Sequence, residues 1–86
     1  MADWFVYVVR CADGTLYTGI TTDVPRRIGV HNSGSGSKYT AARRPVQLVY
    51  AVPAADRSAA SRLERRIKML PREEKLSLIA GSREVP

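Results

Sequence analysis

The sequence predicts an α+β fold, a small three-stranded and mainly antiparallel sheet packed with helices. Strand-like apolar runs alternate with amphipathic stretches, and together they give the order β-β-α-β-α-α. Because the chain has 86 residues, of which 44% are apolar, we expect one domain with one modest core. The single cysteine excludes an internal disulfide, so this core must stabilise the fold unless an oligomer helps.

The first two strands form a predicted hairpin. Residues 4–11 are apolar and rich in β-branched or aromatic side chains, which predicts a strand buried on both faces. Cys11, at its end, is expected to be a small buried residue and not a reactive thiol. Residues 15–21 predict the second strand, and Asp13-Gly14 between the two runs is typical of a hairpin turn.

The loop length of this hairpin decides whether Tyr7 and Tyr17 lie on the same face of the sheet. A two-residue loop would place them on opposite faces, since side chains alternate along a strand. A three-residue loop over 12–14 pairs Cys11 with Thr15, and both phenols then point to one face. We predict the three-residue loop, on the condition that the two tyrosines serve one site.

Caps, helix breakers and periodicity predict the remaining elements. Asp23 is suited to cap the helix that follows the hairpin, and Asp56 or Ser58 the helix after the third strand. Pro71 ends that helix and suits the start of the last one. In chain order we expect a helix over 24–32, a flexible Gly/Ser loop over 33–37, a basic loop over 38–45, a strand over 46–52, a helix to about Leu70 and a last helix ending at Gly81.

The balance of charge favours a polyanionic partner. The chain carries a net charge of +6 and has a pI near 10.1, so nucleic acid is the first expectation. No apolar run approaches the ~18 residues of a membrane span, and no signal peptide precedes the first strand. We therefore expect a cytoplasmic protein without membrane binding, with one domain over residues 1–81 and a flexible tail over 82–86.

Three polar side chains lie at the borders of apolar helix stripes, where they can reach a cleft. Arg27 and His31 are four residues apart and share one face of the first helix, whereas Arg26 points to solvent. A surface arginine and a helix-end histidine bonded to backbone are the alternative interpretations of this pair. Glu64 lies at the border of the stripe of a later helix. It either forms an ion pair with Lys68 at i,i+4 or supplies an oxygen ligand to a divalent cation such as Mg²⁺.

A basic loop offers a second kind of contact. Lys38, Arg43 and Arg44 flank Tyr39, and basic groups beside an aromatic ring suit phosphate contacts and base stacking. A solvated basic loop without a ligand is the alternative interpretation. One histidine and one cysteine are too few for a Cys/His zinc cluster, so we do not expect such a site.

On these residues the chain resembles a GIY-YIG nuclease domain. Tyr7 stands at the tyrosine of the family's first motif, and Tyr17-Thr18-Gly19 resembles the second. Arg27 and His31 follow at the spacing of the family's helix residues, and Glu64 matches the metal-binding glutamate of the later helix. The resemblance extends from Trp4 to about Ile79. The chain is similar to the small bacterial members of the superfamily in the sequence of residues 17–23 and in Arg43-Arg44-Pro45.

The resemblance implies a metal-dependent endonuclease that hydrolyses DNA, with RNA as the alternative substrate, in DNA repair or processing. One divalent metal, Mg²⁺ or Mn²⁺, would bind Glu64, and Arg27 would stabilise the charge that develops on the phosphate. Tyr7 or Tyr17 would orient or deprotonate the attacking water with the help of His31. A phenolate base needs nearby positive charge to lower its pKa from ~10, which Arg27 and the metal would supply.

Two other functions stay open on the sequence. The chain could be a nucleic-acid-binding module with the nuclease fold and little activity, or an adaptor whose partner recognises DNA. A homodimer and a DNA-targeting protein partner are the assemblies that we consider for it.

Overall fold

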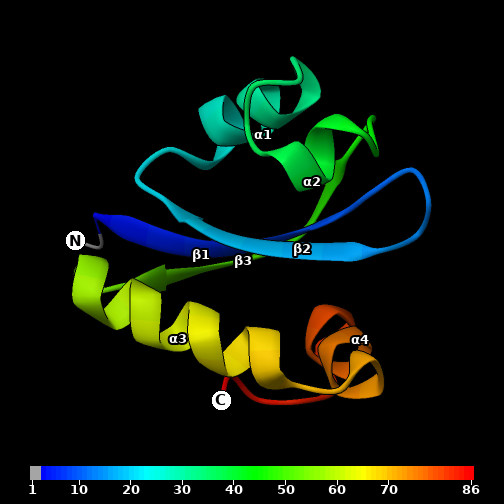
Figure 1. Cartoon of the computed structure of the whole chain (residues 1–86). Coiled ribbons are helices and arrows are strands. Elements are labelled where there is room, and N and C mark those ends of the chain that lie inside the picture. Colours follow the sequence, from blue (N-terminus) through cyan, green and yellow to red (C-terminus); the bar gives the residue numbers. More distant parts are fainter. Residues whose placement is uncertain (1–2) are drawn as a thin grey trace.

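The computed structural model describes residues 3–86. Met1 and Ala2, with which the predicted domain begins, lie outside the described residues. The three strands form one antiparallel sheet in the order β2-β1-β3, with helices on both of its faces (Figure 1). The elements are β1 (Trp4–Arg10), β2 (Leu16–Thr21), α1 (Val24–Asn32), α2 (Lys38–Ala41), β3 (Gln47–Ala54), α3 (Arg57–Met69) and α4 (Arg72–Ala80).

The predicted α+β class and the order of the longer elements are confirmed. One element differs from the prediction. Residues 38–41 form the short helix α2, in the segment that the sequence predicts to be a basic loop. Its N-cap is Ser37, whose side-chain oxygen accepts a hydrogen bond from the backbone N–H of Thr40. The third strand also runs two residues further than predicted, to Ala54, which pairs with Trp4.

The central strand β1 contributes to two separate cores. Its alternate side chains Val6 and Val8 face α3 and α4, where they pack with Ile67. Tyr7 and Val9 face α1 and α2 on the other side of the sheet. This confirms the prediction of a strand buried on both faces, since all four of these strand residues are at most 1% exposed.

The hairpin has the predicted three-residue loop. The backbone N–H of Cys11 donates to the carbonyl of Thr15 at 2.8 Å, and Gly14 adopts the left-handed conformation with φ of 85°. Tyr7 lies opposite Gly19, and Val9 lies opposite Tyr17. Both tyrosines therefore point to the same face of the sheet, toward α1 and α2. Cys11 is buried and free, as expected.

The helix ends follow the predicted caps. Asp23 caps α1, and Asp56 caps α3 by accepting from the N–H of Ala59 at 2.7 Å, which decides between the two candidates for that position. Gly81 ends α4 in the left-handed conformation with φ of 78°. Among residues 3–86, no helix has the length and apolar character needed to cross a membrane. The flexibility of the tail over 82–86 stays a prediction.

Candidate active site

Tyr7 reaches the site by crossing over the backbone of β2. It lies opposite Gly19, where the methyl group of an alanine would come within 2.5 Å of the Tyr7 hydroxyl oxygen. Glycine at this position therefore leaves the space that the phenol ring occupies. The ring lies on the face that α1 and α2 cover, and the residue is 1% exposed.

The phenol of Tyr7 meets two side chains of α1. Its hydroxyl oxygen lies 2.7 Å from Nε2 of His31, and Nε of Arg27 donates to the same oxygen at 3.3 Å. Arg27 and His31 are one helical turn apart, so both point from one face of α1 toward the sheet. The predicted convergence of these side chains is therefore present in the structure.

The segment between α1 and α2 holds the other ends of both side chains. Nη2 of Arg27 donates to the carbonyl of Gly36 at 3.2 Å. Nδ1 of His31 lies 2.8 Å from Oγ1 of Thr40, which is completely buried. The sequence predicted a flexible loop over 33–37, and it is a loop, but Gly36 and Ser37 both have defined partners. Sequence reasoning missed Thr40, although a serine three residues before it is a helix-cap signal.

Tyr17 completes the group from the neighbouring strand. Its ring approaches the ring of His31 edge-on, with 5.2 Å between the centroids, and stacks with Tyr39 at 6.0 Å. Tyr17 is partly exposed, whereas His31 is completely buried. The four residues predicted to be catalytic thus lie together on one face of the sheet. Tyr7 and His31 are buried and Tyr17 is partly exposed, so a site formed by these residues would open to solvent at Tyr17.

Burial controls the protonation of this cluster. It raises the pKa of the Tyr7 phenol above its ordinary value of 10.0, and this outweighs the hydrogen bond and charge of Arg27, which lower the pKa. Burial also lowers the pKa of His31 below 6.5, and the charge of Arg27 adds to that effect. Both side chains are therefore uncharged at neutral pH. The expected lowering of the tyrosine pKa is not achieved by Arg27 alone.

Glu64 lies in the other helical layer, on α3. Its partner is Lys68, whose Nζ is 3.5 Å from Oε2 in the i,i+4 ion pair that the sequence left open. The Glu64 side chain is 23% exposed, and its charge helps to raise the pKa of Tyr7. The carboxylate is therefore within electrostatic range of the phenol although the two residues come from opposite faces of the sheet.

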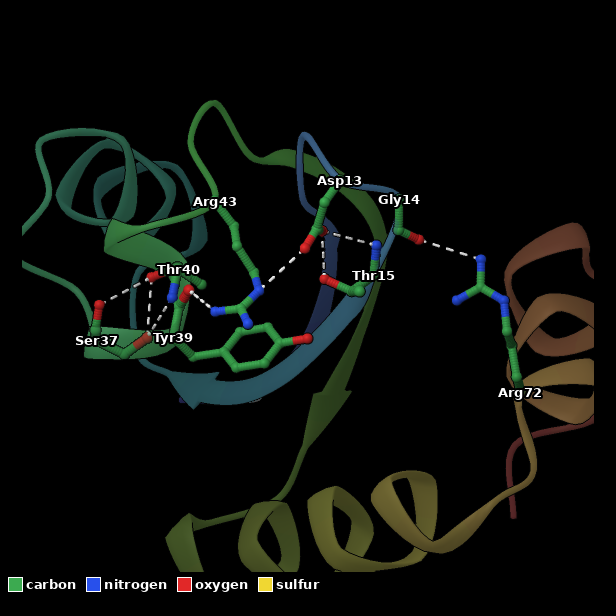
Figure 2. A network of polar contacts seen from close by, with 8 residues as sticks. All are labelled: Asp13, Gly14, Thr15, Ser37, Tyr39, Thr40, Arg43 and Arg72. Carbon is green, nitrogen blue, oxygen red and sulfur yellow. Dashed lines mark hydrogen bonds and ion pairs between the residues drawn. The ribbon is translucent and has the colours of Figure 1, made fainter.

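The residues of the basic stretch differ in how freely they meet solvent. Arg43 lies over the ring of Tyr39, donates to the Tyr39 carbonyl at 2.8 Å and pairs with Asp13 at 3.0 Å (Figure 2). Arg44 donates to the carbonyl of Ala41 at 3.0 Å and to the carbonyl of Asn32, on α1, at 3.5 Å. Both arginines therefore connect parts of the fold. Lys38 is exposed on α2.

A polar groove of about 290 Å³ lies beside Arg27. Arg26, which was expected to point to solvent, is exposed and lines this groove together with Arg27. Two positive side chains at one groove suit an anionic group such as a phosphate. The other lining residues are Thr21, Thr22, Asp23 and Val30.

The fold and this cluster define the class of protein. Residues 3–77 match the family model of the GIY-YIG catalytic domain, and the chain belongs to this family of nuclease domains. Its relatives include a UPF0213 protein of Desulfotalea psychrophila, which is 56% identical over 80 residues that make up 92% of this chain and 73% of that protein. A UPF0213 protein of Staphylococcus haemolyticus is 51% identical over 92% of this chain and 96% of its own length.

Solved structures agree with this assignment. The solution NMR structure of a UPF0213 protein from Bacillus halodurans matches with a TM-score of 0.58 and 44% identity, over 90% of this chain and 82% of that one. A protein from E. faecalis matches with a TM-score of 0.62 and 38% identity, over 94% and 90% of the two chains. The resemblance to the GIY-YIG superfamily and its small bacterial members is therefore confirmed.

Proposed function

We propose that this protein is a metal-dependent endonuclease that hydrolyses phosphodiester bonds of DNA, in repair or processing of DNA. The observation that carries the proposal is the contact of the Tyr7 phenol with both His31 and Arg27. It joins a group that can activate water, an acceptor for its proton and a cation for the phosphate. Membership of a nuclease family supports the same reaction.

Tyr7 is the tyrosine that we propose as the base. Its oxygen lies 2.7 Å from an imidazole nitrogen, so a proton that leaves the phenol has an acceptor within hydrogen-bond reach. The uncharged His31 ring has a free lone pair for that proton, and because burial disfavours the charged ring, the transfer would depend on the phenolate beside it to balance the charge. Arg27 stabilises the resulting phenolate from 3.3 Å. Tyr17, which is more exposed, would orient the attacking water.

Arg27 connects this cluster with the groove in which a phosphate would bind. Its Nε contacts Tyr7 and its Nη2 contacts Gly36, whereas its Nη1 has no hydrogen-bond partner among residues 3–86. That nitrogen can donate to a phosphate oxygen in the groove without loss of the other two contacts. The arginine would thereby stabilise the negative charge that develops during cleavage.

Glu64 is the residue that we propose as the metal ligand. Within the described chain no three acidic, histidine or cysteine side chains gather into a metal site, so one carboxylate would hold the ion together with water and phosphate oxygens. The residue fits this role, because its oxygens are hard ligands and its 3.5 Å pair with the exposed Lys68 is long enough to be replaced. When bound, Mg²⁺ or Mn²⁺ would neutralise phosphate charge and stabilise the leaving oxygen.

The basic stretch would hold the DNA backbone outside the cluster. Lys38 is exposed and free to approach phosphates. A base can stack on the covered face of Tyr39 only if Arg43 moves from its position 3.9 Å above the ring. We therefore propose that Arg43 and Arg44 contact phosphates from the positions where they already connect the fold.

Cleavage of a defined set of DNA substrates tests the proposal. Purified protein with Mg²⁺ or Mn²⁺ is given single-stranded, duplex, flapped and branched DNA. We expect Arg27→Ala to lower the cleavage rate by ~10²-fold or more, because it removes the cation that donates hydrogen bonds to the phosphate. Glu64→Ala should abolish cleavage, while the free energy of unfolding changes by about 1 kcal/mol or less, because the pair is long and Lys68 is exposed.

Matched controls come from an ion pair between α4 and the segment that follows it. Glu74 pairs with Arg83 at 2.9 Å, so Glu74→Ala and Arg83→Ala remove the same residue types outside the cluster and should leave cleavage unchanged. Equal cleavage by the Arg27 and Glu64 variants and wild type would indicate a contaminating nuclease. No cleavage of any substrate, with tight and salt-sensitive DNA binding, would favour the binding module instead.

A further inference from the structure

We propose that Thr40 is a positioning residue that fixes the tautomer of His31, so that Nδ1 carries the proton and Nε2 is the free acceptor that faces Tyr7. This inference deepens the proposed function. Only the expected effect of Thr40 on cleavage rests on that function. The tautomer itself is a property of the folded protein and can be measured without substrate.

The geometry places Thr40 behind the histidine ring. Its Oγ1 lies 2.8 Å from Nδ1 of His31 and 2.9 Å from Oγ of Ser37, and it can also donate to the Ser37 carbonyl at 3.4 Å. Thr40 and His31 both have no exposed surface. Each polar atom in this group must therefore find its partner inside the protein.

One assignment of protons satisfies every group in the cluster. Arg27 donates Nε–H to the Tyr7 oxygen, and Tyr7 donates its hydroxyl proton to Nε2 of His31. The Nδ1–H of His31 then donates to Thr40, whose own hydroxyl proton goes to Ser37. The result is a continuous chain of donors that runs in one direction, from Arg27 to Ser37.

The other tautomer leaves a buried proton without an acceptor. If Nε2 carried the proton, it would donate to the Tyr7 oxygen, which already accepts from Arg27. The hydroxyl proton of Tyr7 would then have no acceptor among residues 3–86, although the residue is 1% exposed. A buried donor without a partner is strongly unfavourable, so the Tyr7 side of the ring favours the proton on Nδ1, and Thr40 supplies the acceptor that this proton needs.

The Thr40 hydroxyl can be removed without disturbing the cap of α2. The cap bond runs from the backbone N–H of Thr40 to Oγ of Ser37, so at the cap, loss of the hydroxyl group keeps this bond and removes only the contacts between that hydroxyl group and Ser37. Thr40→Val keeps the shape of the residue and replaces the hydroxyl group by a methyl group. Thr40→Ser keeps the hydroxyl group. Thr18→Val is a matched control, since Thr18 is a buried threonine whose partner on β1, Val8, faces the other core.

The test uses the nitrogen-15 resonances of the imidazole ring. His31 is the only histidine of the chain, so both ring nitrogens can be assigned without overlap. The spectrum is recorded at pH 8, where the ring is neutral because its pKa lies below 6.5. We expect the proton on Nδ1 in wild type, Thr40→Ser and Thr18→Val. In Thr40→Val the ratio of the two tautomers should change by ~10-fold or more, as expected for loss of one buried hydrogen bond.

Cleavage supplies the second measurement. We expect kcat of Thr40→Val to fall ~10–100-fold with little change in KM. Losses of this size are typical when a residue that orients a functional histidine through a hydrogen bond is removed. Thr40→Ser should restore kcat. A wild-type spectrum with the proton on Nε2 would overturn the inference whether or not any variant folds, and so would an unchanged tautomer ratio in folded Thr40→Val. The expected spectra with no cleavage by wild type would support the inference and refute the nuclease function.

Discussion

Replacing Gly19 by alanine tests how Tyr7 reaches its site. The new methyl group would lie 2.5 Å from the hydroxyl oxygen of Tyr7 and 2.7 Å from the ring carbon that carries it. Neither atom can move aside easily, because the ring is buried and its oxygen is held by His31 and Arg27. The ring, the strand or both must shift.

The expected loss of stability has two parts. Overpacking of a well-packed core costs about 1–3 kcal/mol. Displacement of the phenol also weakens its hydrogen bonds with His31 and Arg27, each of which contributes about 1 kcal/mol. We therefore expect Gly19→Ala to lower the free energy of unfolding by about 2–4 kcal/mol. For a domain of this size, each kcal/mol corresponds to a decrease in Tm of roughly 4–8 °C.

Gly29→Ala is the matched control for this substitution. Gly29 lies on the exposed side of α1, and a methyl group there would meet nothing within 4 Å. Alanine at a helix position of this kind should raise stability by about 0.5–1 kcal/mol. Urea unfolding followed by circular dichroism gives both values. A Gly19→Ala protein within about 0.5 kcal/mol of wild type, with the His31 resonances unchanged, would refute the described path of Tyr7 over β2.

Two further predictions concern pH and the connection between α1 and β3. Burial and Arg27 lower the pKa of His31 in the folded protein below 6.5, so the unfolded chain takes up the imidazole proton at a higher pH than the folded chain does. The contribution of neutral His31 to the free energy of unfolding is therefore complete above pH 6.5. It is lost as the pH falls through the folded pKa. Urea unfolding between pH 8 and 5, with an NMR titration of the single histidine, should show this, and a folded pKa above 6.5 would contradict it. Asn32 both accepts from the N–H of Val46 at 2.7 Å and donates to its carbonyl at 3.1 Å. Asn32→Asp keeps the first bond and turns the second into a repulsion, so the free energy of unfolding should fall by about 1–3 kcal/mol; a change below about 0.5 kcal/mol would show that this contact does not stabilise the fold.

Predictions that depended on local geometry were accurate, with the short helix α2 as the exception. The register of the hairpin followed from side-chain alternation, from a glycine at the position that needs a left-handed conformation, and from the assumption that Tyr7 and Tyr17 serve one site. The helix starts at Asp23 and Asp56 followed from the ability of a short carboxylate to accept a backbone N–H. In each case the interacting groups are close in sequence, so the pattern of residues is sufficient.

Predictions about partners across elements were incomplete for the same reason. Arg43 was expected to contact nucleic acid, but its partner Asp13 lies 30 residues earlier and is brought beside it only when α2 packs over the hairpin. Thr40 received no role, because nothing in its neighbourhood in sequence indicates that His31 will lie beside it. Glu64 was given two alternatives, of which the ion pair with Lys68 is formed and the metal ligand stays a prediction.

The sequence by itself determined that Arg27 and His31 share a face of one helix and that the chain resembles a GIY-YIG domain, because helical periodicity and motif spacing are properties of the chain. It also determined that Tyr7 and Tyr17 share a face of the sheet, on the condition that they serve one site. Only the tertiary structure decided that the phenol of Tyr7 lies between His31 and Arg27, with the pKa of the phenol raised and not lowered. That outcome depends on how much water the packed helices exclude from the sheet, and burial of this kind arises only when distant elements come together.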